Sequence, residues 1–410
     1  MNISFGSYAL FFISPILGLG NSLYRWREHS AKNIICLFTC FYGMAWYQQP
    51  GSNTDAVRYA DQLIEMHVSE ISFQTLRSSF YTEGELNYDL YQPLLTFFVS
   101  RFTDDIRILF GIFGLVLGYF YSRVIYFFLE NLKNKPGLWE LSCIVTLAFA
   151  LNIGSGINGV RMHTAFFVLL YGALYYWSTR KQYYLLVAAS SVLIHYSFAI
   201  PITLLLATPF AQPFALPLYF VFLASFGLAA IDVGIVRNAV AFLPGGIDTR
   251  AGGYMNELYV DSLELPRILR IVVWVQHLFA ICTVTYLFTI WRRYNVPSHF
   301  TRMLTFVMLL YTAVNFLSGV GSIGRYYTLC TILLLGYLML TVNWTVTFDD
   351  NTYMGAALLA LTLVNTAYNF RMFLGFSSVQ LLIGNPLTVW FLNAPEYSLY
   401  EYVPPIFRRL

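Results

Sequence analysis

Four short stretches of the sequence combine residue types that bind anions or transfer protons. They centre on Asp55-Ala-Val-Arg58-Tyr59, Arg161, His195 and Arg325. Arginine presents a planar fork of donors that matches a phosphate, and the start of a helix adds free amide groups. Histidine titrates near neutral pH and serves as a general base. Together these stretches suit a phosphate-containing, anionic substrate.

Each stretch also has an ordinary structural explanation. Asp55 can cap a helix and pair with Arg58, three residues further along the same face. Arg161 and Arg325 can extend from a membrane span to the interface. His195 can be a structural histidine with all its hydrogen bonds satisfied. Spacing alone leaves both interpretations open.

The composition excludes a water-soluble fold. Of 410 residues, 58% are hydrophobic and 11% are charged, whereas a soluble domain carries about 25% charge. Mean hydropathy is +0.60. The net charge of +3 gives no nucleic-acid signal, and the five cysteines lie in apolar runs without metal-ligand spacing. We therefore expect an all-α polytopic membrane protein.

Apolar windows place the spans. A helix needs about 20 apolar residues to cross a bilayer. Candidate spans cover about 3 to 20, 33 to 48, 105 to 128, 138 to 153, 159 to 178, 270 to 291, 301 to 318, 326 to 345 and 353 to 371. With shorter passes added, we expect about 11 to 13 transmembrane or partly inserted helices in one domain covering 1–410.

Charge orients these helices. Basic residues are concentrated in the short connections 21 to 32, 123 to 135, 179 to 182 and 292 to 302. Such connections face the cytoplasm. The acid-rich segments of about 49–92 and 232–266 are expected outside, together with the N-terminus. The aromatic, proline-rich C-terminal segment, about 372–410, is expected to lie at the outer interface.

Two regions do not fit simple spans. The stretch 182 to 231 joins the inner connection 179 to 182 to the outer segment 232–266, so it must cross the membrane an odd number of times. Its apolar run of about fifty residues is too long for one pass, which predicts three short passes. Breaks are expected at His195-Tyr196-Ser197 and at the prolines near 209 to 217, because proline interrupts the helical ladder. Residues 90 to 103 are too short to span and are expected to form a partly inserted or interfacial helix.

The motifs in this order resemble a known family. The resemblance depends on five motifs. They are Asp55-x-x-Arg58-Tyr59, the acidic and aromatic stretch Glu85 to Pro93, Val160-Arg161, His195-Tyr196-Ser197 and Gly324-Arg325-Tyr326. They resemble the EpsG family of polysaccharide polymerases, which is related in role to the Wzy O-antigen polymerases. The resemblance covers roughly residues 30 to 345.

The resemblance implies an enzyme of the GT-C class in the bacterial inner membrane, with its site formed by outer-face loops. It would move a glycan from an undecaprenyl-pyrophosphate carrier onto a second lipid-linked repeat unit at the periplasmic face, without a metal, a nucleotide sugar or another cofactor. Its partners would be these two lipid-linked glycans, the bilayer and a chain-length regulator protein, with no nucleic acid.

Roles for the candidate residues follow as hypotheses. Arg161 and Arg325 would stabilise the departing pyrophosphate. His195 is the first choice for the general base, with Asp55, Glu85 and Asp89 as competitors. The substrate-binding residues would be Asp55, Arg58, Tyr59, Glu85 and Asp89.

Other functions stay open on the sequence. A ligase would use the same donor chemistry. A flippase of lipid-linked glycans would also place arginine in an outward cavity, but it predicts matching broken helices in two halves. A membrane acyltransferase would want its polar residues on the inner side.

Overall fold

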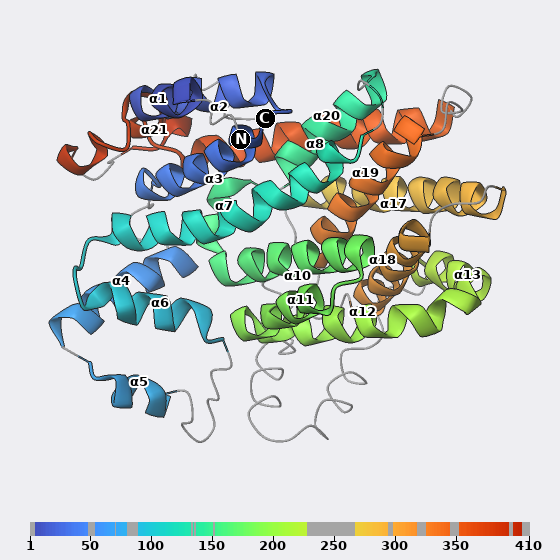
Figure 1. Cartoon of the computed structure of the whole chain (residues 1–410), viewed down its shortest axis with the longest axis horizontal. Coiled ribbons are helices and arrows are strands. Elements are labelled where there is room, and N and C mark those ends of the chain that lie inside the picture. The colour runs from blue at the N-terminus through green and yellow to red at the C-terminus, as the bar shows by residue number, and fades with distance from the viewer. Residues whose placement is uncertain are drawn as a thin grey trace.

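The chain folds into a bundle of helices (Figure 1). The computed structural model describes residues 5–47, 54–69, 71–79, 89–132, 134, 137–150, 152–227, 267–293, 298–317, 325–344, 352–392 and 397–403. Within these ranges the only extended pairings are two isolated bridges, Trp46 with Ser377 and Ser378 with Ser398. The all-α expectation is confirmed for the described residues.

The helices are as follows. They are α1 (Phe5–Ile13), α2 (Pro15–Tyr24), α3 (His29–Met44), α4 (Asp55–Val68), α5 (Phe73–Ser79), α6 (Tyr91–Ser100), α7 (Ile106–Glu130), α8 (Leu138–Ala150), α9 (Ile153–Asn158), α10 (Val160–Thr179), α11 (Gln182–Ile194), η1 (Tyr196–Phe198), α12 (Ala199–Ala211), η2 (Gln212–Phe214), α13 (Ala215–Ser225), α17 (Arg267–Arg293), α18 (Ser298–Phe316), α19 (Tyr326–Trp344), α20 (Thr352–Phe376), α21 (Gln380–Ile383), η5 (Val389–Phe391) and η6 (Leu399–Tyr402).

Five helical stretches among the described residues are long and apolar enough to cross a membrane. They are Ile106–Glu130, Trp139–Asn158, Tyr196–Ser225, which the turn at η2 divides into α12 and α13, Arg270–Arg293 and Gly355–Phe376. This finding supports a membrane-embedded protein, as the composition indicates.

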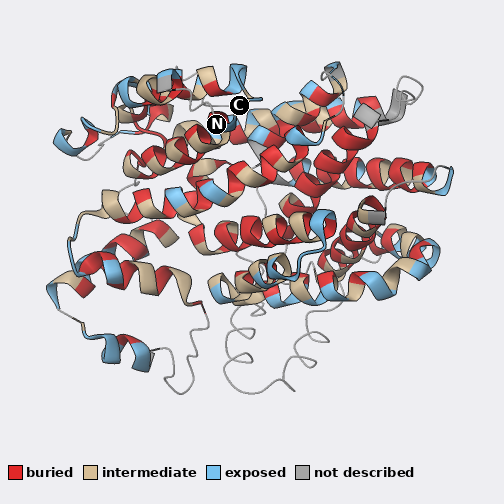
Figure 2. Cartoon of the chain, viewed as in Figure 1, coloured by how far each residue is buried: buried red, intermediate tan, exposed pale blue. Residues whose placement is uncertain are grey.

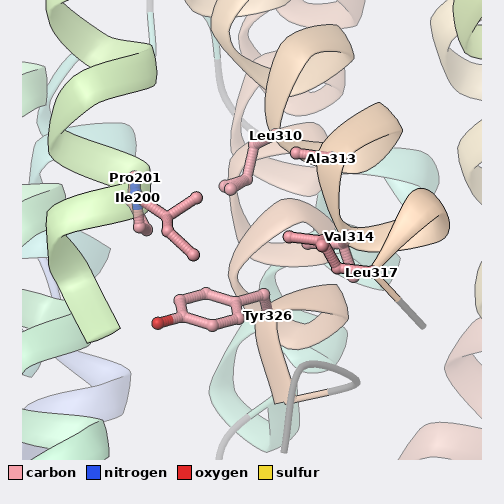
Figure 3. A pocket seen from close by; sticks show the side chains of 7 residues that line it. All are labelled: Ile200, Pro201, Leu310, Ala313, Val314, Leu317 and Tyr326. Carbon is pink, nitrogen blue, oxygen red and sulfur yellow. The ribbon is translucent and has the colours of Figure 1, made fainter. Parts of the chain in front are cut away.

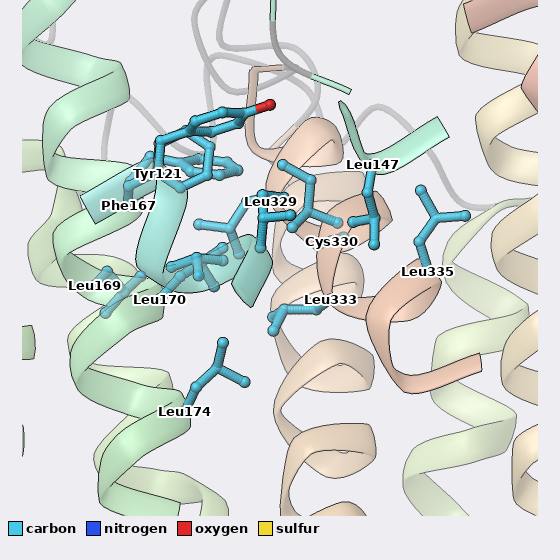
Figure 4. Close-up of a cluster of buried hydrophobic side chains, with 14 of the residues drawn as sticks. Tyr121, Leu147, Phe167, Leu169, Leu170, Leu174, Leu329, Cys330, Leu333 and Leu335 are labelled. Carbon is cyan, nitrogen blue, oxygen red and sulfur yellow. The ribbon is translucent and has the colours of Figure 1, made fainter. Parts of the chain in front are cut away.

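The core lies between α7, α8, α10 and α19. Figure 4 shows their buried side chains meeting, among them Phe167 of α10 and Leu333 of α19. In Figure 2 these central helices are largely buried, whereas α12 and α13 are more exposed. Helices α3 and α7 can approach closely because Gly43 and Gly114 carry no side chain. A Cβ atom at either position would overlap the backbone of the opposite helix. Small residues at such a seam are typical of membrane helix pairs.

The basic connections gather at one end of the bundle. Lys32 Nζ lies 2.8 Å from Glu130 Oε1, and this ion pair joins the connection 21 to 32 to the connection 123 to 135. One small cavity is lined by Asn131, Ser178 and His299, so the connections 179 to 182 and 292 to 302 lie near the connection 123 to 135. The arrangement agrees with their assignment to one membrane face, and we call this end the basic end.

The C-terminal segment packs against the opposite end. Arg107, at the start of α7, donates through Nη1 to the carbonyl oxygens of Val389 and Leu392, at 3.1 and 3.2 Å. The bridge between Trp46 and Ser377 ties the same segment to the end of α3. Both contacts join the C-terminal segment to this end of the bundle, and its position at a membrane interface stays a prediction.

Residues 182 to 227 turn at the two expected breaks. The helix stops at His195, whose backbone is extended, and the chain turns again at η2. Gln212 donates to Thr301 near the start of α18 at 2.9 Å, while Ser225 accepts from Asn315 near its end at 2.8 Å. Helix α13 therefore runs parallel to α18, and α12 runs in the opposite direction. Between α4 and α7, the short α6 is about 15 Å long at 1.5 Å per residue, which fits a partly inserted helix.

The expected single span at 3 to 20 is wrong. Its described part forms two short antiparallel helices, because Pro15 cannot continue the hydrogen-bond ladder of α1 and Ser14 caps α2. Asn21 donates to Ser7 at 2.9 Å, and Gly18 packs on the backbone of Phe11. The start of α1 thus lies at the same end as the end of α2, so a single span no longer supports the expectation of an N-terminus outside, which stays a prediction.

Candidate functional site

A polar cavity of about 300 Å³ lies at the end of the bundle opposite the basic end. It is formed by the start of α4, the segment before α6, the start of α10, the break after α11 and the start of α19. Its lining residues are Asp55, Arg58, Tyr59, Asp89, Gly159, Arg161, Met162, His195, Tyr196 and Arg325. Every sequence-predicted site residue that the structure describes is therefore in one place. Glu85 lies outside the described residues.

Asp89 is the buried centre of the site. Its side chain is 1% exposed, and Oδ2 lies 2.9 Å from Arg161 Nη1. The backbone N–H of Tyr196 donates to Oδ1 at 2.8 Å. Burial alone would raise the pKa of Asp89, but His195, Arg161 and the Tyr196 N–H together lower it, so the carboxylate is charged at neutral pH.

This environment changes the role expected for Asp89. A base needs a free lone pair that faces the substrate. The carboxylate is enclosed, and its donors favour the charged form. It therefore fits the positioning of Arg161 and His195 better than it fits proton abstraction or direct contact with a substrate.

Arg161 lies at the first turn of α10 and is held from two sides. Nε donates to the Tyr59 hydroxyl at 3.0 Å, while Nη1 contacts Asp89. Its Nη2 has no hydrogen-bond partner among the described residues, and the side chain is 27% exposed. Burial raises the pKa of Tyr59 to about 12, so its hydroxyl keeps a proton that it can donate in turn.

His195 occupies the break between α11 and η1. Its Nδ1 lies 3.4 Å from Asp89 Oδ2, close enough for an ion pair when the ring is protonated, but it makes no hydrogen bond with a described residue. The backbone N–H of Leu90 donates to the Leu193 carbonyl at 2.9 Å and fixes the two segments together. Since Nδ1 faces Asp89, Nε2 is the nitrogen available to a ligand in the cavity.

Arg325 precedes α19 and is exposed. The next residue, Tyr326, is hydrogen bonded through its hydroxyl to Ser197 Oγ at 2.7 Å. Figure 3 shows the ring of Tyr326 extending towards Ile200 and Pro201 of α12. The start of α19 is thereby attached to the His195 break. Arg325 makes no ion pair with a described residue.

The start of α4 carries Asp55 and Arg58, the remaining charged residues of the cavity. The backbone N–H of Ala56 donates to Asn158 Oδ1 at 3.2 Å, so α4 docks beside the entry to α10. Arg58 forms an ion pair with Asp55 on the exposed side of this turn. The spacing of Asp55 and Arg58 predicted this pair.

The charges leave the cavity positive. Asp55 pairs with Arg58 and Asp89 pairs with Arg161, which leaves Arg325 without a carboxylate partner in the described chain. In that part of the chain, no three histidine, cysteine or acidic side chains gather as metal ligands do. An anionic ligand is the group that such a cavity accommodates best.

Several contributors were not identified from sequence. Gly159 and Met162 line the cavity without polar side chains, so no chemical pattern marks them. Asn158 anchors α4, and its only signal is a polar residue inside a glycine-rich run. The bond between Ser197 and Tyr326 joins two motifs that are far apart in the chain, and spacing cannot reveal it.

Comparison with known proteins adds nothing to this geometry. No family model matches the sequence, and no curated protein or solved structure is found to be similar to it.

Proposed function

We propose that this protein is a membrane glycosyltransferase that joins lipid-pyrophosphate-linked oligosaccharide repeat units into a polysaccharide. The reaction would take place at the periplasmic face of a bacterial inner membrane, on a GT-C-like scaffold as in the EpsG and Wzy polymerases. One observation carries the proposal. A buried carboxylate, Asp89, joins Arg161 and His195 in a positive cavity at the end away from the basic connections.

The arginines suit the donor's leaving group. When the glycosidic bond to pyrophosphate breaks, negative charge grows on the departing phosphate oxygen. Arg161 lines the cavity, and its orientation is set by Tyr59 and Asp89. Arg325 adds a second cation that is free to pair. Preorganised cations stabilise developing charge because they need not reorganise during the reaction.

His195 suits the acceptor. As the acceptor hydroxyl attacks the anomeric carbon, its proton passes to Nε2, the carbon–oxygen bond to pyrophosphate breaks, and lipid pyrophosphate leaves. Asp89 would hold the ring through Nδ1 and stabilise the imidazolium that forms. This is the division of labour between the carboxylate and the histidine of a catalytic triad.

The other lining residues would orient the sugars. Tyr196 lies beside the base, and Arg58 and Asp55 also line the cavity. Donor and acceptor would each remain attached to a lipid in the bilayer. A chain-length regulator would act on the polymer after transfer.

The test is transfer by purified, reconstituted protein with His195→Gln. Glutamine keeps hydrogen-bonding capacity and similar size but has no titratable nitrogen. We expect a loss of at least about 10²-fold in transfer, the scale of general base catalysis, while lipid-linked substrate still binds. His299→Gln, at the basic end, is the matched control and should retain parental activity.

Two results would contradict the proposal. Transfer by His195→Gln within a few-fold of the parent would remove the base role from His195. Movement of lipid-linked glycan across the vesicle membrane, without any product longer than one unit, would identify a flippase instead.

A further inference from the structure

A second, larger cavity lies between α17, α20 and the turn η6. It measures about 530 Å³ and is lined mainly by apolar side chains such as Val272, Val364 and Leu374. Arg371 and Tyr400 are among its few polar residues. We call it the α17–α20 groove. No residue of the groove also lines the polar cavity.

The groove lies between the ends of two candidate membrane-spanning helices. Its two long walls, α17 and α20, belong to the helical stretches that are apolar and long enough to cross a bilayer. Ile271 is 47% exposed and Phe370 is 50% exposed along these walls. Exposed apolar side chains on a spanning helix contact lipid chains, so hydrocarbon can enter the groove directly from the bilayer.

The groove is near the same end of the bundle as the polar cavity. Asn369, two residues before Arg371, accepts a hydrogen bond from Asn152 at 2.6 Å through its carbonyl oxygen. Asn152 caps α9, which leads directly into α10 and Arg161. Arg371 therefore occupies the end of α20 at which the polar cavity opens.

Arg371 gives the groove a charge that its apolar walls do not explain. The guanidinium carbon lies 5.7 Å from the centre of the Tyr400 ring. Within the described chain it has no carboxylate partner. A cation beside hydrocarbon is costly unless an anion or water meets it, and a phosphate matches the guanidinium fork.

We propose that the α17–α20 groove binds the hydrocarbon chain of a polyprenyl phosphate lipid whose phosphate lies beside Arg371. The inference rests on the proposed function, because the reaction needs two lipid-linked substrates and the polar cavity holds the pyrophosphate of one. The groove would hold the lipid of the second, the acceptor, near the same face of the membrane.

The test counts bound lipid on the purified full-length protein by native mass spectrometry. The probe is a 55-carbon polyprenyl monophosphate, with the corresponding alcohol as a neutral comparison. We expect two bound probe molecules on the parent. Arg371→Gln should weaken one of them at least fivefold and leave binding of the alcohol unchanged. Ala367→Phe, which fills the groove, should weaken both the phosphate and the alcohol there.

Two controls separate local effects from general ones. Ala356→Phe adds the same bulk to an exposed position of α20 outside the groove, and Arg293→Gln removes an arginine from the basic end. Both should bind two probe molecules as the parent does.

Three outcomes would overturn the inference. The first is unchanged binding in both groove variants. The second is equal competition by phosphatidylglycerol, which would make the groove a site for ordinary phospholipid. The third is displacement of the probe by millimolar inorganic phosphate, which would show that the hydrocarbon chain of the lipid contributes nothing to binding.

The two proposals fail separately. If His195→Gln abolishes transfer while the groove variants bind lipid normally, the polymerase proposal stands and the groove inference falls. If the parent shows no transfer, but the Arg371→Gln variant binds one lipid fewer than the parent, the groove stands as a lipid site and the polymerase proposal falls.

Discussion

Replacing Asp89 with asparagine tests the centre of the site. Asparagine has nearly the same shape and still accepts the Tyr196 N–H, but it has no charge for Arg161 or His195. Breaking a buried ion pair costs about 3 to 5 kcal/mol. Because Arg161 keeps Tyr59 and is partly open to the cavity, we expect the free energy of unfolding to fall by the smaller amount of about 2 to 3 kcal/mol.

The effect on transfer can also be bounded. An Asp→Asn change in a catalytic triad lowers kcat by about 10⁴-fold, where the carboxylate bonds closely to histidine. Here the distance between Nδ1 and Oδ2 is 3.4 Å, so the carboxylate holds the ring less firmly. We expect a loss of about 10²-fold, or about 2.7 kcal/mol of transition-state stabilisation.

The pH dependence has a defined sign. The folded-state pKa of Asp89 is lowered, so its contribution to stability is present above the unfolded-state pKa, near 3.9, and is lost as pH falls through the folded value. The difference in stability between the parent and Asp89→Asn should therefore be largest at neutral pH and shrink on acidification. Thermal unfolding in detergent from pH 7 to pH 3 measures it.

Asp105→Asn is the matched control for this experiment. Asp105 pairs with Arg107 at the same end of the bundle but does not line the cavity, and its pKa is also lowered despite partial burial. Asparagine still caps α7. This variant should lose some stability with the same pH trend and keep parental transfer per folded molecule. Equal losses of transfer in both variants, or parental transfer by Asp89→Asn, would refute the role assigned to Asp89.

Two further predictions concern Arg161 and the N-terminal helices. Arg161→Lys keeps the charge but cannot contact Tyr59, Asp89 and a phosphate at once, so transfer should fall at least about tenfold in the reconstituted assay; parental transfer would show that position 161 needs only a charge. A cysteine in place of Gly6, labelled in intact cells, should react from the same side as one in place of Asn21, because α1 and α2 are antiparallel; labelling from opposite sides would restore the single span.

Much of this architecture follows from composition and charge, and the exceptions have physical causes. The windows around α7, α10 and α19 predict their helices because lipid requires long apolar runs. The window at 3 to 20 is apolar as well, but hydropathy does not register that Pro15 and its cap Ser14 end one helix and begin another.

The candidate site was predictable in its members but not in its connections. Helix-start arginine and a histidine at a break are visible in sequence, and they meet in one cavity because all lie at one end of the bundle. The position of Asp89 between Arg161 and His195 depends on the packing of the segment before α6 against the end of α11. No local pattern encodes that contact, so the sequence predicts a substrate-binding role for Asp89 and not the positioning role that the structure favours.

The bond between Ser197 and Tyr326 gives the last prediction, because it joins the residue before α19, Arg325, to the break that holds His195. Ser197→Ala and Tyr326→Phe each remove one partner of the same 2.7 Å hydrogen bond. A single bond is worth about 0.5 to 1.5 kcal/mol, so each variant should lose about two- to tenfold in transfer if the bond positions Arg325.

The double variant should be no worse than either single one, since both remove the same interaction. Tyr327→Phe is the control at the neighbouring position, where the hydroxyl bonds to Asn315 at 2.9 Å, outside the polar cavity. It should lower thermal stability without lowering transfer per folded molecule. Additive losses in the double variant, or an equal loss in Tyr327→Phe, would mean that these hydroxyls support the helix packing and that Arg325 is positioned by other contacts.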